Sequence, residues 1–295
     1  MADNKSNLIS RRQAIISLAA ATAGTLIKPA SVFGVEPVKG KVRFAVIGDW
    51  GTGCDEQAGL SKMMVNTHAK SAFDFVLAAG DNIYPNGSGR YFGKKFEEPF
   101  SKLIDDKVNF YAVLGNHDIE DGRQDQVSYP LFNMSGKNYY MVSKGDGLVD
   151  FFMLDTTDFH QAQAFWLENA LKASTARWKI ALYHHPLYSS GKKHGSDEKL
   201  RRKIEPMLVK YGVKVAFAGH DHMYERTTLQ QGVQHFVTGA GGKMRRGGIK
   251  KDSGITAASF AEDNHFMVVE VDDKSVSFQA ICERGNLVDS GTLTL

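Results

Sequence analysis

The stretch Gly219-His220-Asp221-His222 follows an apolar run, residues 213–218, that is typical of a buried strand. His220 and His222 are predicted to point to the same side of the chain, because side chains alternate in direction along a strand. Two imidazoles that project from one strand end can bind a metal ion. Such a pair is more often a pair of surface histidines, or of histidines that support a site without binding the metal. The other strand ends therefore decide how the pair is interpreted.

Four other runs that are typical of buried strands also end in side chains that bind metal ions. In three of them a glycine directly precedes the polar residue, and glycine permits a sharp turn and a close approach of the backbone. A single Gly-Asp or Gly-Asn step is usually a turn or a helix cap, and a lone histidine is as often a core residue. Five such ends in one chain predict a metal centre. The additional candidates are Asp49 after residues 42–47, Asp81 and Tyr84 after residues 73–79, Asn116 and His117 after residues 110–114, and His184 after residues 179–183.

Strand and helix patterns alternate in the middle of the chain, and strand patterns gather at its end. This order predicts a layered α/β fold in which two mixed sheets lie between helices. Functional sites in such folds form beyond the strand ends, where loops converge. The predicted helices are residues 56–70, 92–104 with an interruption near Pro99, 161–173 and 197–211. A hairpin is predicted for residues 138–142 with 148–154, and further strands for residues 234–238, 266–271, 275–281 and 291–295.

The composition excludes several classes of protein. The 295 residues are 42% hydrophobic and the formal net charge is +3, so the chain can bury a large core, and disorder is not supported. The charge is small and no basic stripe with interleaved aromatic residues is present, so nucleic acid is not an expected partner. Cys54 and Cys282 lie far apart in the sequence, which argues against a thiolate metal site. Two free buried thiols are favoured over one long-range disulfide.

The first 34 residues are typical of an export signal rather than of a folded domain. Ser10-Arg11-Arg12-Gln13 precedes an apolar run, residues 14–27, that is too short and too rich in Ala and Thr for a stable transmembrane helix. The arginine pair resembles a twin-arginine signal, with cleavage near residues 30–34. We expect an exported, periplasmic or secreted protein that uses the twin-arginine export machinery and keeps no stable membrane anchor. An amphipathic or frayed N-terminal helix is the alternative.

The mixture of predicted ligands indicates the kind of metal centre. It combines carboxylates, imidazoles, an amide and a phenol without a cysteine, which argues against structural zinc. The seven ligands are Asp49, Asp81, Tyr84, Asn116, His184, His220 and His222. Seven are more than one ion needs, whereas two ions that share a carboxylate use them all. Pairs of ions about 3.5–4 Å apart clamp the attacking and leaving oxygens in phosphoryl transfer.

The motifs GDWG (48–51), GDNIY (80–84), GNHD (115–118) and GHDH (219–222), with His184 between the last two, resemble the metallophosphoesterase superfamily. More narrowly they resemble the small purple acid phosphatases of the tartrate-resistant type, and the resemblance spans residues 42–295. Tyr84 separates that family from most other metallophosphoesterases. The resemblance implies a four-layer α/β/β/α sandwich, with residues 35–295 as the catalytic domain.

The resemblance also implies how the ligands divide between two ions. Asp49, Tyr84 and His222 would bind Fe(III), Asp81 would bridge, and Asn116, His184 and His220 would bind Fe(II), Zn(II) or Mn(II). Fe(III) suits anionic oxygen ligands, whereas the softer divalent ion suits imidazoles and an amide. A metal-bound hydroxide would be the nucleophile, and an acidic pH optimum would follow.

Two further histidines are implied to act on the substrate. His117 would contact phosphate and protonate the leaving alkoxide, and a hydrogen bond that only supports the ligands is the alternative. His194 resembles a second family histidine near the leaving group, at a spacing from His184 that is one residue longer. His185 is predicted to point away from the centre, by strand alternation, and to be structural.

The implied activity is that of an acid phosphatase acting on small phosphate monoesters. A phosphodiesterase, a nucleotidase, a phytase and a non-catalytic phosphate-binding protein are the alternatives, because the motifs do not specify the leaving group. Residues 158–160 lead directly into a helix where the related animal enzymes carry a long loop, so we expect an open site that needs no proteolytic activation. The basic segment 243–251 either contacts phosphate or, as we favour, forms a solvated loop.

Overall fold

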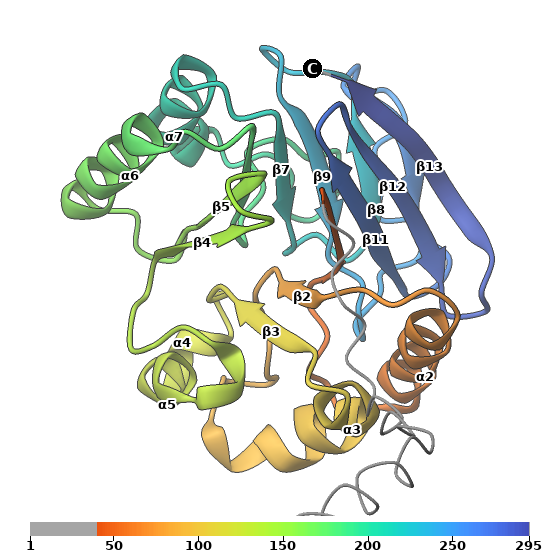
Figure 1. Ribbon diagram of the computed structural model, residues 1–295. Coiled ribbons are helices and arrows are strands. Elements are labelled where there is room, and N and C mark those ends of the chain that lie inside the picture. Colours follow the sequence, from red (N-terminus) through yellow and green to blue (C-terminus); the bar gives the residue numbers. More distant parts are fainter. Residues whose placement is uncertain (1–39, 295) are drawn as a thin grey trace, which may run out of the picture. The chain divides into compact units, whose positions relative to one another are not determined.

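Two sheets that pack face to face between helices form the core of the protein (Figure 1). The computed structural model describes residues 40–294. The strand order is β13-β12-β11-β1-β2-β3 in the first sheet and β10-β8-β9-β7-β6-β5-β4 in the second. Both sheets contain parallel and antiparallel pairs, so the predicted α/β fold with two mixed sheets is confirmed.

The elements have the following bounds. The first sheet contains β1 (Lys41–Ile47), β2 (Phe75–Ala78), β3 (Asn109–Ala112), β11 (His265–Asp272), β12 (Ser275–Cys282) and β13 (Leu287–Thr294). The second contains β4 (Tyr140–Lys144), β5 (Val149–Met153), β6 (Trp178–Leu182), β7 (Val215–Ala218), β8 (Tyr224–Thr227), β9 (Gln234–Thr238) and β10 (Thr256–Phe260). The helices are α2 (Asp55–Lys70), α3 (Glu98–Asp105), α4 (Asp118–Asp121), α5 (Arg123–Ser128), α6 (Gln161–Ala173) and α7 (Glu198–Lys210), with short helical turns η1 (Gly89–Tyr91), η2 (Gly93–Glu97) and η3 (Pro130–Phe132).

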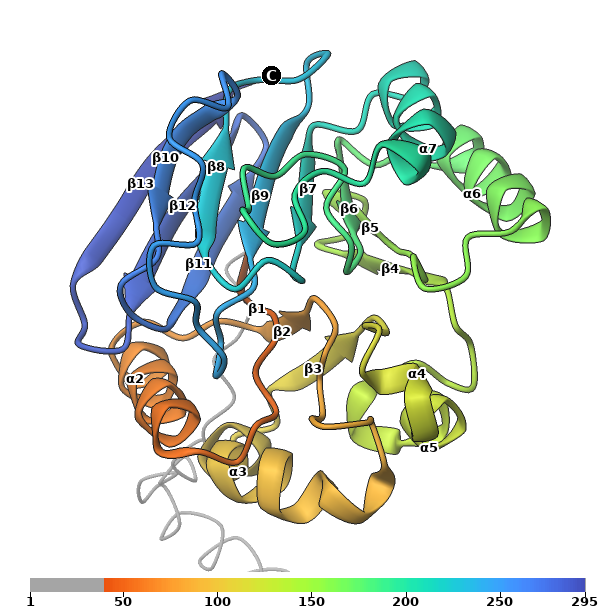
Figure 2. The same cartoon turned by 180° about the vertical axis from the view of Figure 1, so that it is seen from behind.

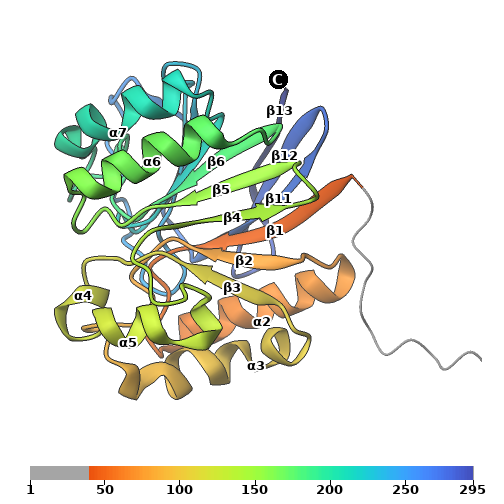
Figure 3. The same cartoon turned by 60° about the vertical axis from the view of Figure 1, so that its left-hand side comes forward.

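Side chains along the second sheet point alternately into two hydrophobic cores, one on each face of the sheet. Phe151 and Met153 of β5 point into the core between the sheets, whereas Phe152 packs with α6 and α7. Phe44 of β1 stacks on Phe75 with 5.3 Å between ring centroids and meets Phe151 edge-on at 5.1 Å, so one ring joins both sheets. Figure 3 shows the resulting layers, with α6 and α7 on one side and α2 and α3 on the other. The four-layer sandwich is therefore confirmed.

Each sheet contains a run of adjacent parallel strands, which gathers their carboxyl ends at one edge. β1, β2 and β3 run parallel in one sheet, as do β5, β6, β7 and β9 in the other. The loops after β1 and β2 approach the loop after β7 in the middle of Figure 2. Gly241 N, in the loop after β9, donates a hydrogen bond to Gly48 O in the loop after β1 at 2.8 Å. Ligand sites in open α/β sheets form outside the carboxyl ends of the strands.

A few elements differ from the prediction. β8 and β10 were not predicted, because both are short and carry few large apolar residues. β13 begins at Leu287 rather than at residue 291, because polar residues of this edge strand also pair with β12. The interruption predicted near Pro99 is a change of helix type: the π-helix η2 ends at Glu97, and Pro99 lies in the first turn of α3, which follows directly.

Other predictions can be compared directly with the described residues. Both cysteines are free, as favoured, although Cys54 is only half-buried while Cys282 is buried. α6 begins at Gln161, directly after the short connection that was predicted. Among residues 40–294, no helix combines the length and the apolar character needed to cross a membrane. The export signal predicted for residues 1–34 lies outside the described residues.

Two histidines buried in the sheets stay neutral over a wide pH range. His265 begins β11 and His235 lies in β9, and both are almost completely buried. Burial penalises the charged imidazolium and lowers the pKa of each to about 3. His265 Nε2 lies 3.2 Å from Thr238 Oγ1. The folded protein therefore holds both rings in the neutral form.

We predict that replacing His265 with Gln makes folding less sensitive to acid. Below pH 6.5 the unfolded chain binds a proton at His265 that the folded chain does not bind, so stability falls by about 1.4 kcal/mol per pH unit, down to about pH 3. Urea unfolding of H265Q between pH 7 and pH 4 should show a shallower loss than the wild type. H160Q, changed at an exposed helix cap, is the control, and equal slopes in all three proteins would contradict the prediction.

Candidate metal centre

The predicted ligands lie in turns beyond the strand ends, where positive φ angles orient several of them. β7 ends at Ala218, and His220 in the following turn has a φ of 71°. Asp49 after β1 and Asp81 after β2 have φ angles of 55° and 48°, a left-handed backbone that Asp adopts more readily than most residues. Strand alternation therefore does not explain why His220 and His222 both reach the site. That part of the prediction is wrong, and the turn brings them there instead.

One group of donor atoms surrounds the Asp49 carboxylate. Tyr84 Oη lies 3.2 Å from Asp49 Oδ1 and 2.8 Å from Asp81 Oδ2. His222 Nε2 lies 3.4 Å from Asp49 Oδ1 and 3.5 Å from Tyr84 Oη. These four side chains come from the loops after β1, β2 and β7, so three strand ends contribute to one group.

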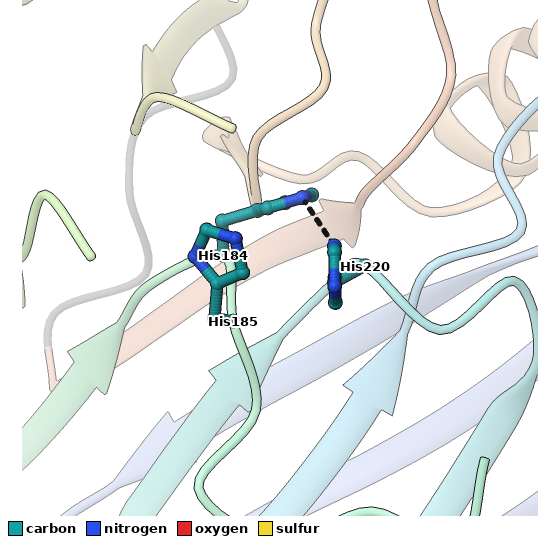
Figure 4. Close-up of side chains that lie close together, drawn as sticks. All are labelled: His184, His185 and His220. Carbon is teal, nitrogen blue, oxygen red and sulfur yellow. Dashed lines mark hydrogen bonds between the residues drawn. The ribbon is translucent and has the colours of Figure 1, made fainter. Parts of the chain in front are cut away.

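A second group of donor atoms surrounds His184. Its Nε2 lies 3.2 Å from His220 Nδ1, 3.2 Å from Asn116 Oδ1 and 3.5 Å from Asp81 Oδ1. Figure 4 shows the contact between His184 and His220. His184 Nδ1 lies 2.8 Å from Ala79 O, so Nδ1 carries the hydrogen and Nε2 is left with a free lone pair. Asp81 belongs to both groups, with one carboxylate oxygen facing each.

Glycine is required at two points where the turns cross. A Cβ atom on Gly115 would lie 2.2 Å from Asp81 Oδ1, and one on Gly80 would lie 2.6 Å from His184 Nδ1. Any larger residue would displace one of these side chains. The glycines that precede the polar residues thus permit the close approach that the motifs indicated.

Without a cation, burial makes the charged forms of these side chains unfavourable in free energy. Burial and the neighbouring charge of Asp81 raise the pKa of Asp49 well above its usual range. Burial also lowers the pKa of His184 well below its usual range, and the pKa of His222 to about 3. A cation favours ionised carboxylates and neutral imidazoles at the same time, so it removes both costs. Carboxylates, imidazoles, a phenol and an amide in mutual contact are a donor set that fits metal ions.

His117 lies at the rim of the first donor group. Its ring centroid is 4.7 Å from that of Tyr84. Its Nδ1 lies 2.6 Å from Pro85 O and 3.3 Å from Glu120 Oε1. Because a carbonyl only accepts, Nδ1 donates to Pro85, and Nε2 is the atom left to meet a substrate.

His194 lies beside the second donor group, in a loop that a buried aspartate holds. The exposed His194 ring packs on His220 with 4.0 Å between centroids, and burial lowers the pKa of His194. Ser189 Oγ and Gly195 N donate to Asp221 Oδ2 at 2.6 and 3.0 Å, which fixes the two ends of the loop. Sequence reasoning did not assign Asp221 a role, and its place between the two histidines of one motif was the available signal.

His185 is turned toward the centre, not away from it. β6 ends at Leu182, so strand alternation does not extend to His185. The His185 ring centroid lies 4.5 Å from that of His220, and its Nδ1 lies 3.0 Å from Thr156 Oγ1. His184, His185 and His220 each place one nitrogen within 4.8 Å of the others, and Figure 4 shows the three rings together. The predicted orientation of His185 is therefore wrong.

The basic segment after Gly242 packs against the centre. Lys243 Nζ lies 4.1 Å from the centroid of the Tyr84 ring, and Arg245 N donates to His222 O at 3.0 Å. After burial, the charges of Arg245 and Lys243 contribute most to the lowered pKa of His222. Lys243 is nevertheless exposed and Arg245 is half-buried, so the segment remains solvated while it packs against the centre.

A buried aspartate that sequence reasoning did not single out holds two of the turns together. Asp118 accepts hydrogen bonds at 2.8–3.1 Å from the backbone N–H groups of Asn82, Ile83 and Gly115. It also accepts from Asn82 Nδ2 at 3.1 Å and from Gln126 Nε2 at 2.6 Å. Burial raises the pKa of Asp118 to about 7, although five donors favour the ionised form. Its position at the end of the GNHD motif was the only signal in the sequence.

We predict that Asp118→Asn destabilises the protein by roughly 2–4 kcal/mol. The amide presents an NH2 group to neighbours that only donate, so buried N–H groups lose their acceptor at about 1–3 kcal/mol each. Urea unfolding at pH 8 measures the change. Asp106→Asn, at an exposed aspartate, is the control and should alter stability by less than about 0.5 kcal/mol. Wild-type stability in D118N would rule out the structural role.

Comparison with known proteins places this geometry in context. Residues 42–224 match the family described as calcineurin-like phosphoesterase. The chain is 33% identical over 248 residues to purple acid phosphatase 17 of Arabidopsis thaliana, covering 73% of each chain. It is 27% identical over 256 residues to tartrate-resistant acid phosphatase type 5 of Homo sapiens, covering 74% of this chain and 78% of the relative.

Two solved structures share the fold at low sequence identity. Purple acid phosphatase PPD1 from yellow lupin seeds superposes with a TM-score of 0.73 at 20% identity, over 87% of this chain and 54% of that chain. GAP50, described as the anchor in the inner membrane complex of Plasmodium, superposes with a TM-score of 0.78 at 21% identity, over 87% of this chain and 90% of that chain.

Proposed function

The chain belongs to the purple acid phosphatases, within the calcineurin-like phosphoesterase family, and on this premise we propose that it is an acid phosphatase that hydrolyses small phosphate monoesters at two metal ions. The observation that carries the proposal is the position of Asp81. One oxygen of its carboxylate faces Tyr84 at 2.8 Å and the other faces His184 at 3.5 Å. A carboxylate that lies between two donor groups is what two adjacent ions require.

The two donor groups differ in chemistry, and this supports different ions. Asp49, Tyr84 and His222 would hold Fe(III), because hard Fe(III) prefers anionic oxygen ligands. Asn116, His184 and His220 would hold Fe(II), Zn(II) or Mn(II), because imidazoles and a neutral amide suit a softer divalent ion. Such ions, when bound, lower the pKa of water so that it can act as the nucleophile, and neutralise charge on the phosphate oxygens.

Tyr84→Phe is expected to abolish the visible absorption band of the iron-loaded protein, because that band needs a phenolate bound to Fe(III). The measurement is a visible spectrum together with the metal content of the wild type and the variant. Tyr139→Phe, at a half-buried tyrosine outside the two donor groups, is the matched control and should keep the band. An iron-loaded wild type without colour, or a Y84F protein that keeps the band, would refute the ferric assignment.

His117 is the side chain best placed to give a proton to the leaving group. Because Nδ1 donates to Pro85 O, Nε2 carries a hydrogen only when the ring is the imidazolium. Glu120 Oε1 lies 3.3 Å from Nδ1, where it can pair with the imidazolium. Desolvation lowers the pKa of His194, so less of its ring is protonated at a given pH, and this suits substrate binding better than proton donation.

We predict that His117→Asn lowers kcat by about 10²- to 10⁴-fold on an alkyl phosphate, whose leaving group needs a proton. The loss should be much smaller on p-nitrophenyl phosphate, since that leaving group departs without protonation. The measurement is kcat and KM on both substrates at one acidic pH, with His194→Asn as the comparison that should mainly raise KM. An equal loss on both substrates in H117N would exclude the proton-donor role.

The leaving group and the cellular location also belong to the proposal. Relative rates on monoesters, diesters, nucleotides and phytate distinguish the acid phosphatase from a phosphodiesterase, a nucleotidase or a phytase.

The direct entry into α6 at Gln161 supports an open site that needs no proteolytic activation. Arg11 and Arg12 support export through the twin-arginine route, which carries folded proteins and so suits a protein that acquires its metals before export.

A further inference from the structure

A groove leads from the second donor group along the first turn of α7, and the reaction proposed above uses none of its cations. The groove has a volume of about 640 Å³. His194 and His220 line it at the centre, and Lys193, Lys199 and Arg202 also line it. A further hollow of about 370 Å³ continues past Lys199. A leaving group attached to a phosphate near His194 therefore has room to extend into this groove.

The groove carries more cations than acids: Lys193, Lys199 and Arg202 line it with Asp197 and Glu198. Arg202 lies 3.6 Å from Glu198 and is neutralised by it. The Asp197 carboxylate accepts a hydrogen bond from Lys199 N at 3.0 Å, so it faces the helix backbone. Lys193 and Lys199 form no ion pair with any residue of the described range 40–294, and both are exposed. Two ammonium groups are thus free to bind an anion.

The walls of the groove do not suit an aromatic leaving group. Among the described residues that line the groove itself, Pro186 is the one with an apolar side chain of any size, and none is Phe, Tyr or Trp. The further hollow past Lys199 adds Phe159 and Leu200, and both of these side chains are buried. Nucleobases and other aromatic groups are bound by apolar or aromatic surfaces. The groove instead offers charged and hydrogen-bonding groups, so a polar, anionic leaving group matches it better.

We propose that this groove binds a second phosphate group of the substrate through Lys193 and Lys199. The preferred substrates would then be monoesters whose leaving group carries another phosphate. The lysine ammonium binds phosphate as a compact charge with several donors. This inference rests on the proposed function, because it takes the ester that is cleaved to lie beside His194 and His220.

The test compares fructose 1-phosphate with fructose 1,6-bisphosphate on the metal-loaded protein. The wild type should show a kcat/KM for the bisphosphate that exceeds the twofold gain expected from two cleavable groups. The double variant Lys193→Gln/Lys199→Gln should lose roughly tenfold in kcat/KM on the bisphosphate, because charge-assisted hydrogen bonds to phosphate are the strong class. Its kcat/KM on the monophosphate should change less than about twofold. The bisphosphate preference should also shrink in high salt, since the ammonium groups are exposed.

Two control variants each remove one positive charge through the same Lys→Gln substitution. Lys62→Gln is on α2, exposed and outside the groove, and should behave as the wild type. Lys243→Gln removes a cation close to Tyr84 that does not line the groove, and should affect both substrates alike. A selective loss on the bisphosphate in K243Q would show a general effect of charge and would overturn the groove assignment.

The remaining outcomes separate this inference from the proposed function. Equal losses on both substrates in the double variant, or no preference for the bisphosphate in the wild type, would overturn the inference alone. Release of phosphate from neither substrate would overturn the proposed function. Calorimetric titration with fructose 1,6-bisphosphate would then decide the inference: roughly tenfold weaker binding in the double variant supports it, and equal binding overturns it.

Discussion

Two buried carboxylates, those of Asp49 and Asp81, both contact the hydroxyl group of Tyr84. Two negative charges that share one buried site repel each other, which is unfavourable. The backbone reduces this cost, because His220 N donates to Asp49 Oδ2 at 2.7 Å and His117 N donates to Asp81 Oδ1 at 2.9 Å. These N–H groups orient the carboxylates without neutralising them. A cation is the partner that the arrangement still requires, and the backbone contributes to the position of the anionic ligands that would hold it.

The position of the ligands depends on turns, and acidic residues outside the donor groups hold those turns in place. Asp118, at the end of GNHD, accepts hydrogen bonds from the turn after β2 and from its own turn. Asp221, inside GHDH, accepts hydrogen bonds from the loop that carries His194. Each motif therefore combines residues that face the centre with a residue that fixes the backbone. Glycines at the crossings allow the turns to approach, since a Cβ there would meet a ligand.

Much of this could be predicted from the sequence, because the ends of buried strands are where apolar runs meet polar residues. Orientation beyond those ends could not be predicted from strand alternation: His185 and His220 lie in turns, and one of them has a positive φ. The position of Lys243 over Tyr84 was also missed, because it depends on a contact between residues far apart in the chain. The burial of Glu225 in β8 was missed for a similar reason, since its hydrogen-bond partners lie in other loops.

Glu225 shows how closely the centre and its surroundings are connected. It accepts hydrogen bonds from Ser190 N at 2.7 Å and from Ser190 Oγ and Thr256 Oγ1 at 2.5 Å. Together with Asp221 it fixes the loop that carries Lys193 and His194. Residues 219–225 therefore place His220 and His222 in the donor groups. Through Asp221 and Glu225, the same segment also fixes one wall of the groove. Because one short segment supports both, a backbone shift there would change the metal ligands and the binding of the leaving group together, whereas changes at the exposed tips of the lysines would alter only the latter.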